Sequence, residues 1–509
     1  MTDMAATGSQ REVELKLAIA SESARTTAGR EVGRAPARSV ETIYFDTPKR
    51  RLKSAGYTLR LRRDGEQWSQ SVKASDAGLS RFEQDHPLRG GVPDFSLLEG
   101  TPIASLVGPQ DHLAAIFVTR VQRQSRRRAQ NGSRIELSLD DGEVIAQNRS
   151  WPILELELEL KAGEPEALFD HGRRLAGDDA FVPGFMSKAE RGYALADGIL
   201  GEPVKFGAYA LDANMPSSAA FRALARRCLR QISLNAELVA RGARLEALHQ
   251  ARTALRRLRV AVGVFKPLLE PGRVQAIKAE LEWLTAELAD ARNLDVFMFE
   301  TFRPSAEAVA DRQAAAAFGR ALMKSHDRAH ERARAALSSS RFRLLLLDAA
   351  HWIEGELEPT LGEGVDDPRT ADFAARALAK RRHALRRRLE ALDWKDPFAR
   401  HKARISAKKM RYASEFFLDM GPGSRSDRYR PFVKALAALQ DDLGRLNDFT
   451  VAEPMLPTIL QAAPSEAVEA ERVGYAAGLI MGRDLAKAAK LGKSAQRASR
   501  AFLDKPIWW

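Results

Sequence analysis

The sequence predicts an α+β protein of more than one domain, in which an antiparallel β region is followed by an all-α region. Two changes along the chain carry this prediction. Apolar and polar residues alternate with a period of two between Arg11 and about Leu160, and they recur with a 3.6-residue period after about Pro216. A length of 509 residues also favours two to four domains over a single hydrophobic core.

Five segments of the first region have the alternation that is typical of half-buried strands. In order they are REVELKLAI, GYTLRLRR, WSQSVKA, SRIELSLD and ILELELELK. Short helices are expected near residues 165–178 and 101–107. Tight turns between antiparallel strands favour Asp-Gly and Asn-Gly, and such pairs occur at Asp64-Gly65, Asn131-Gly132 and Asp141-Gly142.

The second region consists of long segments rich in Ala, Leu and Arg with few β-branched residues, which predicts helices. Pro, Gly and Asn without clear periodicity separate it from the β region and indicate a linker. We expect a disordered N-terminus at 1–10, a β domain at 11–200, a linker at 201–216 and a helical domain at 217–505 with halves at about 217–350 and 370–505.

The formal net charge of +13 is distributed unevenly along the chain. Residues 1–210 carry 29 Lys and Arg against 30 Asp and Glu, whereas residues 211–509 carry 51 against 37. We therefore expect the helical region to bind an anionic partner.

Cysteine content and hydropathy indicate the compartment. The single cysteine, Cys228, excludes an intrachain disulfide framework and a cysteine-based zinc site, and it fits a reducing compartment. No stretch of about 18 uncharged apolar residues occurs, and the N-terminal residues lack the apolar core of a signal peptide. The expected location is the cytoplasm, with no membrane partner.

Charged residues gather on single faces of the predicted strands. Because residues i and i+2 of a strand share a face about 7 Å apart, paired carboxylates could share a hard divalent ion, and Lys and Arg opposite them could hold phosphate. The other interpretation is a solvent-facing surface with cross-strand salt bridges, and spacing alone leaves both open. The grouped residues are Glu12, Glu14 and Lys16; Arg60 and Arg62; Glu136 and Asp140; and Glu155, Glu157 and Glu159.

Seven sequence segments, taken in their order along the chain, indicate resemblance to a known family. EVELKL, TIYFDTPKRRL, YTLRLRR, SVKA, RIELSLDDGEV, PILELELELKAG and SKAERGYAL together resemble the CYTH domain of triphosphate tunnel metalloenzymes over about residues 11–200. The resemblance implies an eight-stranded antiparallel tunnel that binds a triphosphate and a divalent metal. By residue, it implies metal ligands at Glu12, Glu14, Glu136, Glu155 and Glu157, and phosphate-binding residues at Lys16, Arg60, Arg62, Lys73, Arg123 and Lys188.

One position departs from the family pattern. Ser125 stands where many relatives have a second arginine, and Arg126–Arg128 follow it, either as a substitute or as a solvated hairpin tip.

The β region has no discernible Ser-His-Asp or Cys-His set, which argues against covalent catalysis. Its carboxylates and cations could supply a Mg²⁺ or Mn²⁺ ion, a positioned water and positive charge over the leaving group, so the expected reaction is metal-assisted hydrolysis. Catalytic roles are assigned to Glu12, Glu14, Lys16 and Glu157. The substrate class is a triphosphate, and the family resemblance favours inorganic triphosphate. Thiamine triphosphate and ATP are alternatives, and their rings would need an aromatic surface, for which Trp68, Tyr57 and Phe82 are the candidates.

The helical region contains an internal repeat. HQARTALRRLRVAVGVF, from His249, and HKARISAKKMRYASEFF, from His401, match at an offset of 152 residues. On a helix, each segment places a cationic stripe beside an apolar stripe, which Leu255, Leu258 and Phe265 represent in the first copy. A solvated helix face is the simpler interpretation of one copy, whereas two copies favour a binding surface for a polyanion.

A second signature follows each copy, LTAELADARNLDVF at 284–297 and LAALQDDLGRLNDFTV at 436–451. Together these motifs resemble the CHAD domain, which implies two related four-helix bundles that bind inorganic polyphosphate. Asn293 and Ala289 depart from the usual Asp and Gly of the family. The implied polyphosphate-binding residues are His249, Arg252, Arg256, Arg257, Arg259, His401, Arg404, Lys408, Lys409, Arg411 and Tyr412.

Nucleic acid is the competing polyanion. Proteins that bind single-stranded nucleic acid usually have aromatic residues on which the bases stack, and Tyr412 is the only residue of the two basic helices that could provide such a surface. The sequence therefore predicts a metal-dependent triphosphatase joined to a polyphosphate-binding module, with polyphosphate granules as a further location. The alternative is a non-catalytic protein in which both domains only bind polyphosphate.

Overall fold

The computed structural model describes residues 10–74, 80–207, 209–242, 245–307, 309–354, 366–418, 420, 425–463 and 466–509, without the side chains of 10–12, 80–81, 425–428, 447–454 and 484–490. The chain forms two compact units. The first comprises residues 1–203 and 338–357, and the second comprises residues 204–337 and 358–509. Within the described residues, no helix is long and apolar enough to cross a membrane.

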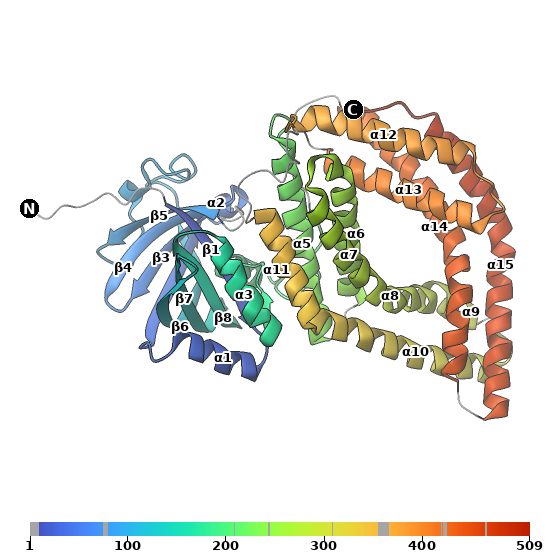
Figure 1. Cartoon of the computed structure of the whole chain (residues 1–509), viewed down its shortest axis with the longest axis horizontal. Coiled ribbons are helices and arrows are strands. Elements are labelled where there is room, and N and C mark those ends of the chain that lie inside the picture. The colour runs from blue at the N-terminus through green and yellow to red at the C-terminus, as the bar shows by residue number, and fades with distance from the viewer. Residues whose placement is uncertain are drawn as a thin grey trace, which may run out of the picture. The chain divides into compact units, whose positions relative to one another are not determined.

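The first unit is built around a closed antiparallel sheet (Figure 1). Its strand order is β5-β4-β3-β2-β6-β7-β8-β1, and pairing between β1 and β5 completes the ring. Eight strands therefore form the predicted tunnel, and β9 (Phe181–Pro183) adds a ninth beside β1. The ring strands are β1 (Gln10–Ile19), β2 (Arg38–Asp46), β3 (Tyr57–Asp64), β4 (Gln67–Ala74), β5 (Ser80–Leu88), β6 (Ala114–Gln130), β7 (Ser133–Ala146) and β8 (Arg149–Ala162).

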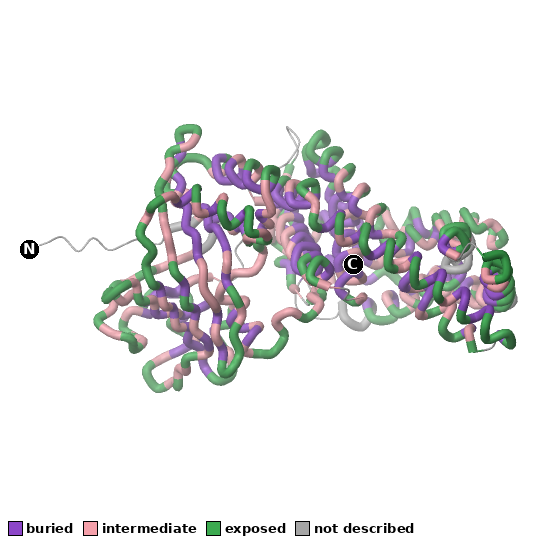
Figure 2. Tube along the Cα trace, turned by 90° about the horizontal axis from the view of Figure 1, so that it is seen from below, coloured by how far each residue is buried: buried purple, intermediate pink, exposed green. Residues whose placement is uncertain are grey.

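Alternation along the strands separates two apolar clusters. Leu59 and Leu61 alternate with Arg60 and Arg62, and they pack on the outer side of the ring with Ile103. A second cluster fills part of the inner side, and its members are Val40, Tyr44, Phe117, Val121, Val144, Ile153 and Tyr193. Burial therefore changes from residue to residue along the strands, whereas it follows one side of the long helices (Figure 2).

Several helices pack on this ring. α1 (Glu22–Val32) and α3 (Glu166–Asp178) lie on its outer face, and α3 confirms the helix expected near 165–178 (Figure 1). α11 (Ser340–Glu354) lies along α3, and α2 (Arg51–Ser54) is a single turn.

α4 (Lys188–Ala196) packs on the inner apolar cluster. A side chain at Gly192 would place its Cβ 2.0 Å from the Phe117 ring, so glycine is what lets this helix approach β6. The approach brings Lys188, the first residue of α4, to the inner face of the ring.

Two local predictions are wrong. Residues 102–106 form turns rather than a helix, after the 3-10 turn η1 (Phe95–Leu98), because Ile103 and Val107 hold this segment against the outer face. Asp141-Gly142 lies inside β7 rather than in a turn. A Cβ at Gly142 would lie 2.0 Å from the carbonyl oxygen of Arg120, so close approach of β6 explains this glycine. The Asn131-Gly132 turn is confirmed, with φ values of 48° and 77°.

The second unit is helical, as predicted. Its first half contains α5 (Ser217–Arg241), α6 (Leu245–Phe265), η2 (Lys266–Leu268), α7 (Pro271–Glu287), α8 (Ala289–Val296), η3 (Phe297–Phe302), α9 (Arg303–Ala306) and α10 (Arg312–Ser338). Its second half contains α12 (Thr370–Glu390), α13 (Pro397–Phe416), α14 (Arg425–Gln461) and α15 (Ala467–Leu503). The two repeated motifs occupy α6 and α13.

The halves share a core around Phe265 at the end of α6. The Phe265 ring stacks on Phe373 at 4.8 Å between centroids, and it also contacts Phe221 and Phe417. Phe265 and Phe417 are equivalent under the 152-residue offset, and their rings lie 5.9 Å apart. The apolar stripe is buried as predicted, at Leu255, Leu258, Val262, Phe265, Met410 and Phe417.

Candidate functional site

One cavity inside the ring collects the predicted phosphate-binding cations. The two-residue period of each strand turns these side chains to the inner face, and α4 adds a lysine at its N-terminus. A capping box between Ser187 and Glu190 fixes that end of α4. The cations that line the cavity are Lys16, Arg60, Arg62, Lys73, Arg123 and Lys188.

The carboxylates gather on one side of this cavity. Asp140, Glu155 and Glu157 are buried, and each offers an oxygen within 4.8 Å of the others. Glu14 also lines the cavity, and its Oε2 lies 2.6 Å from Lys16 Nζ. Glu12 is part of β1, but its side chain lies outside the described residues.

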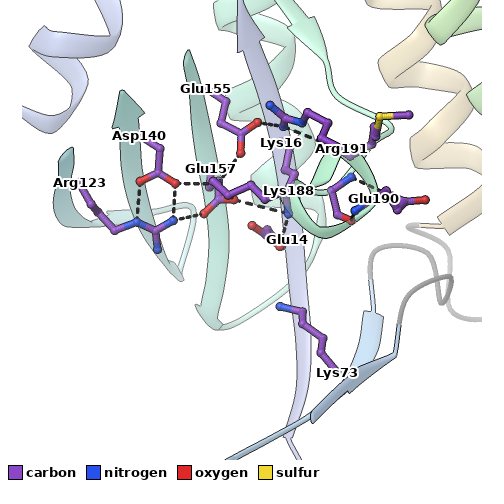
Figure 3. A network of polar contacts seen from close by, with 12 residues as sticks. Glu14, Lys16, Lys73, Arg123, Asp140, Glu155, Glu157, Lys188, Glu190 and Arg191 are labelled. Atoms are coloured by element: carbon purple, nitrogen blue, oxygen red, sulfur yellow. Dashed lines mark hydrogen bonds and ion pairs between the residues drawn. The ribbon is translucent and has the colours of Figure 1, made fainter. Parts of the chain in front are cut away.

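Lys188 occupies the centre of the three buried carboxylates (Figure 3). Its Nζ lies 2.7 Å from Asp140 Oδ2 and 2.7 Å from Glu157 Oε1, and it also donates to Glu155. Arg123 donates from Nε to Asp140 and from Nη2 to Glu157, each at 2.6 Å, whereas Arg191 pairs with Glu155. The three carboxylates are therefore arranged around positively charged groups.

These contacts keep the carboxylates ionised. Burial raises the pKa of Glu155, but Lys188 and Arg191 more than offset it and lower the value from 4.5 to about 2. Burial likewise raises the pKa of Glu157, and Lys188 and Arg123 hold it well below 4.5. At neutral pH these side chains are therefore ionised, and their oxygens could accept a cation.

Arg62 differs from the other lining cations. Burial lowers its pKa, and the nearby charges of Arg123 and Arg60 lower it further. Across the described part of the chain, no carboxylate lies within ion-pair distance of Arg62. By contrast, Arg60 and Lys73 both pair with Glu83, at 2.6 and 3.1 Å. Among the described residues, the cavity thus contains an arginine without a direct carboxylate partner.

Glu136 lies apart from the three clustered carboxylates. It pairs with Arg127 Nε at 2.9 Å and with Lys161 Nζ at 3.8 Å, and it does not line the cavity. The register explains this separation, because Glu136 faces Glu159 across β7 and β8 whereas Asp140 faces Glu155.

The arginines after Ser125 also point elsewhere. Ser125 Oγ lies 2.9 Å from Ser138 Oγ. Arg127 and Arg128 pair with Glu136 and Glu31, and none of residues 126–128 lines the cavity.

The sequence interpretation missed three residues of this site. Asp140 was noted as sharing a face with Glu136 but was not chosen as a ligand. Arg191 stands one helical turn after Lys188, so the 3.6-residue period could have indicated it. Glu83 belongs to β5, whose sequence SRFEQDHPL lacks an alternating apolar pattern.

In the helical unit, α6 and α13 pack against each other and bring the two motifs together. Arg256 Nη1 lies 3.5 Å from Tyr412 Oη, between equivalent stretches of the two helices. Burial lowers the pKa of Arg252 to about 10, and Arg256 and Arg292 contribute to the shift. Burial and Arg292 also lower the pKa of His249, so this stripe has an excess of positive charge. The remaining motif residues of α13 are His401, Arg404, Lys408 and Arg411.

The repeat is asymmetric at one pair of positions. Arg257 Nη2 pairs with Glu415 Oε2 at 3.0 Å, and its guanidinium lies 4.5 Å from the Phe206 ring centroid. The equivalent of Arg257 is Lys409, and the equivalent of Glu415 is Gly263.

Cations surround Lys409 in place of that carboxylate. Partial burial of its side chain lowers its pKa, and Arg388 and Arg259 lower it further. In the parts of the helical unit that are described, no carboxylate pairs with Lys409. Two of the surrounding cations share one carboxylate, because Glu282 pairs with Arg259 at 3.3 Å and with Lys278 at 3.7 Å.

Comparisons with known proteins agree with this two-part organisation. The CYTH domain family matches residues 10–193, and the CHAD domain family matches residues 223–457. An inorganic triphosphatase of Haemophilus influenzae is 33% identical over 158 residues, which is 30% of this chain and 44% of that protein. This chain therefore spans less than half the length of that relative.

A solved structure resembles the helical part. The crystal structure of the CHAD domain from the plant Ricinus communis is 30% identical with a TM-score of 0.51, and the match covers 60% of this chain and 98% of that one. The chain therefore belongs to the proteins in which a CYTH domain is followed by a CHAD domain.

Proposed function

We propose that the tunnel hydrolyses inorganic triphosphate (tripolyphosphate) with the help of Mg²⁺ or Mn²⁺. The observation that carries this proposal is the pairing of three convergent carboxylates with six cations around one cavity. Carboxylate oxygens suit hard divalent ions, and clustered Lys and Arg suit phosphate oxygens. The named activity of the Haemophilus influenzae relative supports the same reaction class.

The donor set fits a hard divalent ion, because the three clustered residues that could donate to a metal, Asp140, Glu155 and Glu157, are all carboxylates. Glu14, Asp140, Glu155 and Glu157 would hold the ion, and Glu12 is a further proposed ligand. Glu136 is left out of this set because Arg127 and Lys161 already bind it elsewhere. When bound, the ion neutralises phosphate oxygens and stabilises the charge of the leaving group.

The protein side chains supply positioning and charge. Arg60, Arg62 and Lys73 on β3 and β4 would bind one end of the triphosphate, with Lys16, Arg123 and Lys188 nearer the carboxylates. Arg62 is the first contact that we assign to phosphate, because no carboxylate of the described residues competes for it in an ion pair. Phosphoryl transfer depends mainly on such positioning and electrostatic stabilisation.

Glu157 would orient the attacking water. Its lowered pKa keeps it ionised at neutral pH, so it accepts a hydrogen bond from the water and directs the lone pair of the water oxygen toward phosphorus. Lys16, 3.6 Å from Glu157 Oε1, holds that carboxylate in place.

The aromatic residues favour inorganic triphosphate over a triphosphate with a ring. Trp68, Tyr57 and Phe82 pack against the outer cluster around Leu59, so they are not available as a stacking surface in the cavity. Tyr44 does line the cavity, but its ring stacks on Phe117 at 4.4 Å.

Phosphate release from tripolyphosphate, thiamine triphosphate and ATP tests this proposal, each with Mg²⁺, with Mn²⁺ and with EDTA. We expect metal-dependent release that is fastest with tripolyphosphate and lost in Glu157→Gln. Glu159→Gln is the matched control, because Glu159 is on the same strand but pairs with Lys161 at 2.6 Å. A protein that binds tripolyphosphate without hydrolysing it would support the non-catalytic alternative.

We further propose that the helical domain binds inorganic polyphosphate along α6 and α13, and that this binding brings the protein to polyphosphate granules. The excess of positive charge around Arg252 and Lys409 supports a polyanion. Tyr412 is buried, so it offers no face for base stacking, and this favours polyphosphate over single-stranded nucleic acid.

A further inference from the structure

A cluster of two histidines and one aspartate lies in the helical unit, outside the basic motifs. His326 and His330 are four residues apart on α10, so they share one face of that helix. His326 Nε2 lies 2.9 Å and His330 Nε2 lies 2.8 Å from the same oxygen, Asp295 Oδ1, on α8. The Nε2 atoms of both histidines therefore converge on one carboxylate oxygen.

The hydrogen bonds of this cluster are incomplete. Asp295 is 1% exposed, and its second oxygen, Oδ2, is buried with no hydrogen-bond partner among the described residues. An unpaired buried oxygen costs about 1–3 kcal/mol, so such an atom calls for an explanation. A cation between the two helices would give both oxygens of Asp295 a partner.

The other nitrogen of His326 faces a second carboxylate. Its Nδ1 lies 3.5 Å from Asp327 Oδ1. If neutral His326 donated from Nε2 to Asp295, its Nδ1 would carry a lone pair facing that second carboxylate. With a metal on Nε2, the proton moves to Nδ1 and can be donated to Asp327, which is the usual outer partner of a ligating histidine.

We infer that Asp295, His326 and His330 bind a divalent transition-metal ion of the Zn²⁺ type. Two imidazole nitrogens and one carboxylate oxygen form a three-ligand set that leaves room for water, as Zn²⁺ accepts. The set differs in chemistry from the carboxylates of the tunnel, which suit Mg²⁺ or Mn²⁺. The His326 side chain is 12% exposed, so an ion can reach the cluster from that side.

The bound ion would join α8 to α10 across 31 residues of sequence. Because it binds the folded state, it should raise the melting temperature as its concentration exceeds the dissociation constant. The inference does not depend on the activity of the tunnel, whose residues are all in the other unit.

Co²⁺ binding to the full-length, metal-stripped protein is the test, because Co²⁺ with nitrogen ligands in a four-coordinate site absorbs visible light far more strongly than Co²⁺ held by carboxylates and water. We expect one such Co²⁺ per chain, displaced by Zn²⁺. His326→Gln and Asp295→Asn should each weaken binding by about tenfold or more. His383→Gln, which changes an exposed histidine on α12, should leave the signal unchanged.

Several results would overturn the inference. Wild-type protein that gives no strong visible absorption with Co²⁺ and no Zn²⁺-dependent rise in melting temperature contains no such site, and this result requires no variant to fold. Equal Co²⁺ absorption in the wild type and in His326→Gln would show that the ion binds at a different site. If His326 and His330 titrate together with Asp295 and the protein binds no Zn²⁺, the cluster binds protons and not a metal ion.

Discussion

Lys188 Nζ lies 2.7 Å from Glu157 Oε1, inside the carboxylate cluster that we assign to the metal ion. The ammonium at the start of α4 therefore stabilises the same oxygens that the ion would bind. In the absence of metal, Lys188 offsets the repulsion among Asp140, Glu155 and Glu157. When metal enters, we expect Lys188 to turn toward the triphosphate in the cavity that it also lines.

Lys188→Met should destabilise the metal-free protein and make its stability dependent on metal. Removing one partner of a buried ion pair costs about 3–5 kcal/mol, and we expect the lower end of this range because Arg123 and Arg191 remain. Mg²⁺ should restore much of the loss by replacing the missing charge. Denaturant unfolding in EDTA and in Mg²⁺ measures both effects.

Lys53→Met is the matched control for this variant. Lys53 pairs with Asp197 at the surface, where its side chain is 38% exposed, so its loss should cost about 0–1 kcal/mol with no response to Mg²⁺. Equal losses in the two variants would contradict the central role of Lys188.

Acid should destabilise the metal-free protein between about pH 4.5 and pH 2. The pKa of Glu155 is about 2 in the folded protein against 4.5 for a free side chain, and that of Glu157 is also lowered. A lowered folded pKa contributes stability that is complete above pH 4.5 and is lost as pH falls through the folded value.

Glu155→Gln should therefore reduce the slope of unfolding free energy against pH in this window, because one fewer proton is taken up on unfolding. Glu66→Gln removes the same charge from an exposed turn and should leave the slope unchanged. A slope that Glu155→Gln does not alter would mean that other carboxylates govern the acid transition.

Much of the fold could be predicted from the sequence because its strands alternate strictly and its helices repeat. β1, β3 and β8 have apolar residues on one face and charge on the other, and β4 has mainly Ser and Lys73 on its second face; this alternation is what a closed ring requires. β5 and the interior glycine of β7 could not be predicted in this way. Gly142 resembles a turn residue in sequence, and only the approach of β6 explains it.

The site was harder to predict because the register of strand pairing determines which side chains lie next to one another. Glu136 and Asp140 share a face of β7, so alternation treats them alike. Only the register places Asp140 against Glu155 and Glu136 against Glu159. The histidine cluster has the same difficulty, since Asp295 comes from another helix than His326 and His330.

Arg62→Met should reduce hydrolysis without destabilising the protein. Arg62 has no direct anionic partner among the described residues, and Arg123 and Arg60 repel it, so its removal should leave the melting temperature unchanged or higher. A charge-assisted hydrogen bond contributes about 1.5–3 kcal/mol, which corresponds to a loss in kcat/KM of roughly tenfold to a hundredfold.

The neighbouring arginine provides the comparison. Arg63→Met changes an exposed residue on the outer face of β3 and should preserve kcat/KM for tripolyphosphate. If Arg62→Met kept full activity, Arg62 would not contact the substrate.

Lys409 and Arg257 offer a test of polyphosphate binding at equivalent positions of the repeat. Arg257 is already paired with Glu415, whereas Lys409 lies among Arg388, Arg259 and Arg381 and pairs with no carboxylate in the described part of the helical unit. A polyanion should therefore gain more from Lys409. Lys409→Ala should weaken binding of long-chain polyphosphate to the full-length protein in EDTA, and Arg257→Ala should weaken it less.

Salt dependence separates a direct phosphate contact from general attraction. Each phosphate contact that is lost should reduce the slope of log affinity against log salt by about 0.7–0.9, as for nucleic acid phosphates, so Lys409→Ala should lower the slope and Arg257→Ala should not. Both variants remove one positive charge, and attraction over more than about 8–10 Å is screened at physiological salt. If the two variants lose affinity equally, or if single-stranded DNA of matched charge competes as well as polyphosphate, then α6 and α13 belong to a diffuse basic surface and not to a specific polyphosphate site.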